Sequence, residues 1–126
     1  MDTCLKCEAA SDADTRWEVI LETQMCIWES PTSMPEVDIQ FGDGIGTYCS
    51  EEHAMVAVNE YLLLVGADAQ WSDVRPIETC ACCHKDFDTT TSWHKVLTLI
   101  EESGEPPDLS IGTVEYVARF CQKCVP

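Results

Sequence analysis

The chain has 126 residues, of which 45% are apolar, 23 are acidic, 7 are basic and 9 are cysteines, and its formal net charge is −16. This apolar content argues against general disorder, and the absence of a run of about 18 uncharged apolar residues excludes a membrane-spanning helix. The N-terminal residues show neither the basic nor the apolar part of a secretory signal, so we expect an intracellular (cytoplasmic) protein. In such a protein an odd number of cysteines indicates metal ligation rather than a disulfide framework.

A C-x2-C pair, Cys4 and Cys7, opens the chain, and two short apolar segments follow it. Residues 16–21 and 25–28 contain β-branched and aromatic side chains, which favour strands. We predict that these two strands form a hairpin that turns at residues 22–24.

The next segment predicts a loop, a strand and a helix. Residues 30–35 contain two prolines and predict the loop, residues 37–41 alternate as in a strand, and residues 42–44 (Gly-Asp-Gly) suit a turn. Ser50 suits a helix N-cap, and apolar residues then recur at helical spacing until Gly66, where the helix is expected to end.

The second half repeats some of these features. A linker, residues 67–79, precedes a second C-x2-C pair that begins at Cys80. Residues 93–100 fit either a strand or a helix, because their apolar side chains satisfy both spacings. Residues 112–120 alternate like a strand that leads into the last C-x2-C pair, which begins at Cys121.

Eight cysteine and histidine residues form four ligand pairs along the chain. Three pairs are C-x2-C turns, which place two sulfurs about one tetrahedral edge apart. The remaining pair, which is the second in chain order, joins a cysteine to a histidine in the first helical turn. Two pairs complete a closed four-ligand shell, which is typical of structural rather than catalytic zinc. We therefore predict two structural Zn²⁺ ions per chain, the first held by Cys4, Cys7, Cys49 and His53 and the second by Cys80, Cys83, Cys121 and Cys124.

Other chemistry with these residues stays open at this point. An iron–sulfur cluster takes the same cysteine ligands, whereas a thioredoxin-like redox pair requires a preceding strand and a long following helix, which neither flank predicts. Cys26 lies in an apolar run and is expected to be buried, and Cys82 is an alternative ligand to Cys83. We expect His84 and His94 at the surface or beside the ligands.

The first C-x2-C pair and the tryptophan that follows it (Trp17) recur at the same spacing in the second half (Trp93). This repeat predicts two tandem units, residues 1–66 and residues 80–126, joined by the linker 67–79. Units of this size bury little core, so the metals are expected to supply much of the stability. The alternative is a cross-brace, in which the first pair shares a metal with the third; the long separation of the second and third pairs favours sequential sites.

The first unit resembles a treble-clef zinc finger, in which a knuckle and hairpin are followed by a helix that supplies the last two ligands. Residues 48–53 (Tyr-Cys-Ser-Glu-Glu-His) are similar to the [FY]-C-S-x-x-C signature of FCS- or TRASH-type fingers, with His53 at the last cysteine position. The second unit resembles a zinc ribbon, because residues 120–124 (Phe-Cys-Gln-Lys-Cys) look like its knuckle. These resemblances imply an α+β fold made of two small zinc-stabilised units.

The charge is concentrated in the first unit, where residues 1–66 carry 13 acidic and 2 basic side chains. Seven basic residues without a cluster do not suit phosphate contacts, so direct nucleic-acid binding is disfavoured. We expect instead that an acidic surface binds a basic surface on a partner protein. By analogy with small acidic phage proteins, this would be a nucleic-acid-mimicking inhibitor such as an anti-restriction or anti-CRISPR protein. The candidate contact residues are Glu18, Glu22, Glu51, Glu52 and Glu60.

An adaptor that binds through an apolar patch around Trp28, Trp71 or Trp93 is the alternative, with acidity serving solubility. Catalysis is not expected, because H-E-x-x-H, G-x-S-x-G, Gly-rich phosphate loops and the zinc deaminase pattern are all missing from the sequence. A closed four-ligand zinc site also leaves no position for a substrate water. The sequence does not indicate an oligomeric state.

Overall fold

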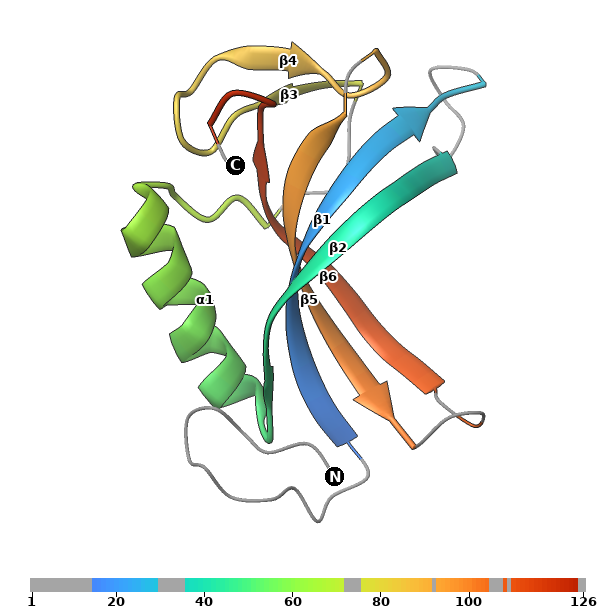
Figure 1. Ribbon diagram of the computed structural model, residues 1–126, viewed down its shortest axis with the longest axis vertical. Coiled ribbons are helices and arrows are strands. Elements are labelled where there is room, and N and C mark those ends of the chain that lie inside the picture. Colours follow the sequence, from blue (N-terminus) through green and yellow to red (C-terminus); the bar gives the residue numbers. More distant parts are fainter. Residues whose placement is uncertain are drawn as a thin grey trace.

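The computed structural model describes residues 15–29, 36–71, 76–91, 93–104, 108 and 110–124. Four long antiparallel strands form a strongly twisted sheet, and one helix lies against one of its faces (Figure 1). Two short strands form a separate hairpin at one end of the sheet. The elements in chain order are β1 (Thr15–Ile27), β2 (Glu36–Tyr48), α1 (Glu51–Val65), β3 (Ile77–Thr79), β4 (Asp86–Asp88), β5 (His94–Ser103) and β6 (Ser110–Phe120).

The sheet has the order β2-β1-β5-β6, so its central pair joins the first half of the chain to the second. β1 pairs with β5 from Thr15 opposite Ser103 to Gln24 opposite His94. The prediction of two separate units is therefore wrong for the described residues, because strands of both halves share one sheet. An isolated two-stranded hairpin is only marginally stable. When the two halves of the chain pair, each buries more apolar surface against the other. The described residues form one helix and six strands and are mainly β, so the α+β prediction is only partly correct.

β1 and β2 are longer than the sequence predicted. Residues 22–24 do not turn: β1 passes through them, and each pairs with a residue of β2 or β5. β2 likewise continues through Gly42, with register shifts opposite Val19/Ile20 and Thr23/Gln24 in place of a turn. A side chain at Gly42 would come within 3.2 Å of the Ile20 side chain, so this glycine permits close approach between strands rather than a turn.

The helix begins and ends where its capping residues predict. The backbone N–H of His53 donates to Ser50 Oγ at 3.2 Å, and Gly66 adopts a left-handed conformation (φ 71°) in which its N–H reaches the carbonyls of the last turn. The C-terminal end of α1 points toward the end of the sheet where β3 and β4 lie, and its N-terminal end lies toward the opposite end (Figure 1). The helix face toward the sheet carries Ala54, Ala57, Val58 and Leu62.

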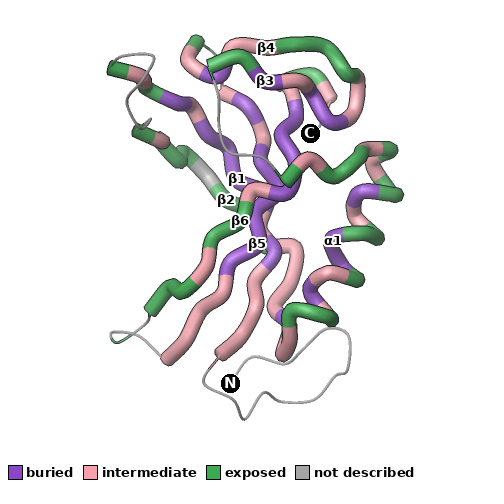
Figure 2. Tube along the Cα trace, turned by 180° about the vertical axis from the view of Figure 1, so that it is seen from behind, coloured by how far each residue is buried: buried purple, intermediate pink, exposed green. Residues whose placement is uncertain are grey.

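The ambiguous segment 93–100 is a strand from His94 onward, because β5 lies between β1 and β6 and pairs with both. Leu97 and Leu99 belong to the core cluster beneath α1, whereas Val96 and Thr98 are buried on the opposite face. The predicted strand 112–120 is confirmed within β6. Figure 2 shows that burial is greatest where the strands cross and on the side of α1 that faces them. The buried core cluster is Val19, Leu21, Tyr48, Ala54, Ala57, Val58, Leu62, Cys80, Ala81, Leu97, Leu99, Val117, Ala118 and Phe120.

Candidate metal centre

Two turns converge at the end of the sheet where β3 and β4 lie (Figure 1). The first turn follows β3: the N–H of Cys80 donates to the carbonyl of Lys85 at 2.9 Å. The second turn follows β6, where the N–H of Cys124 donates to the carbonyl of Cys121 at 3.2 Å. The N–H of Ala81 donates to the carbonyl of Arg119 at 2.8 Å, which ties the first turn directly to β6. The backbone therefore brings the two C-x2-C pairs together.

The sulfurs of Cys80, Cys83, Cys121 and Cys124 all lie within 4.8 Å of one another. The Sγ atoms of Cys83 and Cys121 are 3.7 Å apart, and those of Cys121 and Cys124 are 3.4 Å apart. Zinc–sulfur bonds of about 2.3 Å give a tetrahedral edge of about 3.8 Å. The four cysteines therefore match the dimensions of a closed tetrahedral metal site.

Backbone amides support Cys80 as a thiolate. Its Sγ accepts hydrogen bonds from the N–H groups of Cys82, Cys83 and Cys121 at 3.4, 3.5 and 3.3 Å. Burial raises the pKa of the Cys80 thiol, but the amide hydrogen bonds outweigh it and lower the pKa to about 6. The pKa of Cys124 is raised by its hydrogen bonds with Cys121 and Cys83, and a divalent cation that binds thiolates would displace its proton.

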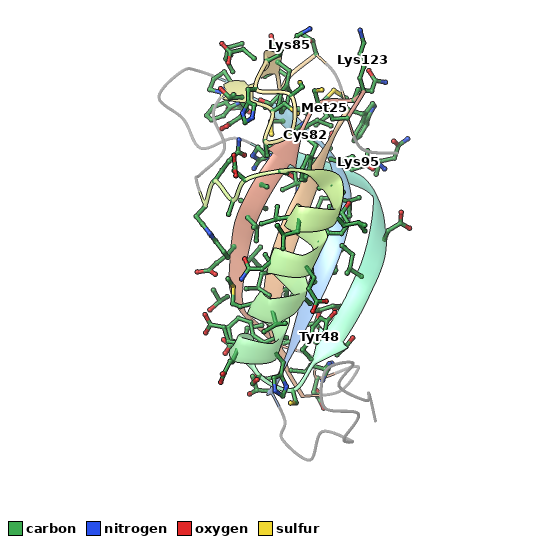
Figure 3. The ribbon with its side chains drawn as sticks, turned by 90° about the vertical axis from the view of Figure 1, so that its left-hand side faces the viewer. Met25, Tyr48, Cys82, Lys85, Lys95 and Lys123 are labelled. Carbon is green, nitrogen blue, oxygen red and sulfur yellow. The ribbon has the colours of Figure 1, made fainter. Side chains whose placement is uncertain are left out.

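These four residues are the ones that the sequence predicted for the second site. Because the third and fourth ligand pairs lie together, they do not form the cross-braced arrangement. Cys82 points away from them: its Sγ donates to the carbonyl of Val65 at 3.4 Å, at the C-terminal end of α1 (Figure 3). The group of four cysteines that could hold a metal ion therefore contains Cys83 and not Cys82. All seven described cysteines are free thiols, and Cys26 is buried as predicted.

Two of the four residues predicted for the first site, Cys49 and His53, lie together at the N-terminal end of α1. Cys49 Sγ lies 3.2 Å from Nδ1 of His53, which faces back toward it from the first helical turn. Cys4 and Cys7 lie outside the described residues. Because α1 has 15 residues, its two ends are about 22 Å apart; Cys49 and His53 lie at its N-terminal end, and Val65, which contacts Cys82, ends it.

A buried polar group beside the metal centre was not predicted. Arg119 is 1% exposed, and its Nη1 donates to Nε2 of His94 at 2.9 Å and to Oε1 of Gln24 at 3.4 Å. Burial lowers the pKa of Arg119, and the nearby acidic groups oppose this effect. His94 is buried and therefore not at the surface, whereas His84 is exposed as expected. Arg119 pairs with Val96, whose side chain lies on the sheet face away from the core cluster, so no local pattern in the sequence indicates its burial.

The five predicted partner-binding glutamates differ in exposure. Glu51, Glu52 and Glu60 are exposed on α1, and Glu18 is half-buried on β1. Glu22 is only 9% exposed and accepts a hydrogen bond from Gln24, so it does not form part of an open acidic surface.

Exposed carboxylates that were not predicted occur along β2, at Glu36, Asp38 and Asp43. Burial raises the pKa of Tyr61 on α1, and the charge of Asp43 raises it further, so this β2 carboxylate lies near the helix. Of the tryptophans considered for an apolar patch, Trp71 is exposed, whereas Trp28 and Trp93 are half-buried.

The described residues include no helix that is long and apolar enough to cross a membrane. No protein-family model, curated protein or solved structure matches this chain. The resemblance to treble-clef and zinc-ribbon fingers stays a prediction from motifs.

Proposed function

We propose that this chain is a non-catalytic binding protein in which structural zinc stabilises a scaffold for an acidic surface, and that this surface binds a basic surface on a partner protein. The observation that carries the proposal is the distribution of charge. No lysine or arginine occurs between Arg16 and Arg75, and this stretch contains β2 and α1. We define the acidic surface as the exposed carboxylates of these two elements: Glu36, Asp38, Asp43, Glu51, Glu52 and Glu60.

The metal has a structural role in this proposal. Four thiolates fill the coordination shell of Zn²⁺ and leave no position for a substrate, which supports a non-catalytic site. We propose a second zinc ion at Cys49 and His53, completed by Cys4 and Cys7. Metal analysis of the purified protein should give two zinc ions per chain. A measured content of one zinc ion per chain would remove the first site from the proposal. An iron–sulfur absorption band would reject zinc at both sites.

The partner is a protein surface rich in lysine and arginine, of the kind that holds nucleic acid. Carboxylates on a rigid helix and strand compete with phosphates for such a surface at a small cost in ordering entropy. The protein would then inhibit its partner by occupying the channel or groove. Electrostatic steering makes this association fast and sensitive to salt.

The test begins with capture of the partner from cells of the source organism and identification by mass spectrometry. Affinity is then measured at about 0.05 and 0.5 M salt, between which the Debye length falls several-fold. Glu51→Lys with Glu52→Lys should weaken binding strongly. The matched control, Asp108→Lys with Glu115→Lys, makes the same charge change at exposed positions away from the acidic surface and should have a smaller effect.

Affinity that does not respond to salt or to the α1 charge reversal would reject the acidic-surface proposal. It would leave the adaptor alternative, for which Trp71 is the exposed one of the three tryptophans considered.

A further inference from the structure

Two adjacent leucines on α1 are almost fully exposed. Leu63 is 84% exposed and Leu64 is 82% exposed, and Val56, two turns earlier on the same side of the helix, is 44% exposed. The core beneath α1 is filled by other residues, among them Val58 and Leu62. Leu63 and Leu64 therefore contribute little to the packing of this chain, and we call Val56, Leu63 and Leu64 the leucine patch. Exposed apolar side chains gathered on one helix face are typical of a binding site.

Negative charge surrounds the leucine patch. Glu52 and Glu60 lie one turn before and after Val56 on the exposed side of α1, and the helix contains no lysine or arginine. The last helical turn lacks a basic residue to offset the negative end of the helix dipole, and Leu63 and Leu64 lie in that turn. A complementary ligand must therefore offer both apolar and positively charged groups.

The geometry of the leucine patch fits a helix. Its apolar residues extend over about 12 Å of α1, which is a little over two helical turns. A helix with apolar residues at i, i+3, i+4 and i+7 presents an apolar ridge of the same length, and its flanking positions can carry lysine or arginine. Two copies of this chain meeting through the leucine patch would instead bring glutamates against glutamates.

Hydrogen bonds also fix the C-terminal end of α1, which carries Leu63 and Leu64 of the leucine patch. The N–H of Gly66 donates to the carbonyls of the last turn, and Cys82 in the metal-centre turn donates to the carbonyl of Val65. Little conformational entropy is lost when a partner binds to such a helix end.

We propose that the leucine patch, with the glutamates around it, binds a basic amphipathic helix of the partner protein. This inference rests on the proposed function and specifies the partner: leucine-like side chains contact Leu63 and Leu64, and lysine or arginine side chains contact Glu52 and Glu60.

The test uses the zinc-loaded full chain and a synthetic 15-residue peptide of leucine and lysine, with the leucines at helical spacing. A peptide of the same composition, reordered so that the leucines do not share one face, is its control. Calorimetry at about 0.15 M salt should show at least tenfold tighter binding of the amphipathic peptide. Leu63→Ser with Leu64→Ser should weaken its binding at least tenfold, about 1.4 kcal/mol. Ile111→Ser with Val114→Ser, at exposed apolar positions of β6, should change it less than twofold.

Equal binding of the two peptides, or unchanged binding by the leucine variant, would overturn the inference. If the leucine variant binds the peptide normally but Glu51→Lys with Glu52→Lys abolishes binding, the inference fails and the proposed function stands. A free protein that is a dimer, and that becomes a monomer with Leu63→Ser and Leu64→Ser, would assign the patch to a second copy and also overturn the inference.

Discussion

Replacing Cys121 by serine should abolish the zinc binding that we propose at the four-cysteine site and destabilise the fold. A metal at this site cross-links Cys83 to Cys121, which are 38 positions apart in the chain. If the cross-link acts like a disulfide, closing a loop of about 38 residues stabilises the folded state by about 4 kcal/mol at 25 °C. For a chain of 126 residues, with an unfolding entropy of about 2.1 cal/mol/K per residue, this corresponds to a fall in Tm of about 15 °C.

The matched control is Cys82→Ser, the same substitution in the same turn at a sulfur that points away from the other four. Its Sγ donates to the carbonyl of Val65, and a serine hydroxyl can also donate, so the expected loss is about 1 kcal/mol or less. Zinc content is measured by metal analysis and Tm by differential scanning calorimetry in a zinc buffer. If Cys121→Ser keeps all its zinc and its Tm, or if Cys82→Ser loses a zinc ion, the ligand assignment is wrong.

Two further predictions concern the fold. Ser50→Ala removes the acceptor of the His53 N–H at the start of α1 and should lower the free energy of unfolding by about 1 kcal/mol in urea titrations; an unchanged midpoint would show that the cap contributes nothing. The isolated fragment 1–66 contains β1, β2 and α1 but lacks β5, the second strand that pairs with β1, so its circular dichroism should show no cooperative unfolding; a sharp transition would contradict the shared sheet.

Features with local signals could be predicted from the sequence. The helix ends at Ser50 and Gly66 follow from side-chain capping and from the left-handed conformation that glycine tolerates. The C-x2-C turns of the metal centre are also local, and two of them suffice to specify four ligands. The choice between Cys82 and Cys83 required the structure, because it depends on which of the two sulfurs forms a hydrogen bond with the end of α1.

Features that depend on distant partners could not be predicted. Residues 22–24 look like a turn between two apolar segments, but pairing with β2 and β5 on both sides keeps them extended. The internal repeat suggested two units, and nothing local indicates that β1 would pair with β5. The burial of Arg119 has the same origin, since His94 and Gln24, which contact it, come from β5 and β1.

The β1–β5 pairing also sets the order in which the chain can fold during synthesis. Gln24 pairs with His94, which is the shortest separation within this strand pair, so 70 residues must be added after Gln24 before the pair can begin to form. At about 5–20 residues per second, a ribosome needs roughly 4–14 s for this stretch. During that time β1 can pair with β2 on one side only, and its other edge stays open to strands of neighbouring chains. The lack of lysine and arginine between Arg16 and Arg75 gives every such nascent segment the same negative charge, so that neighbouring copies repel one another until β5 arrives.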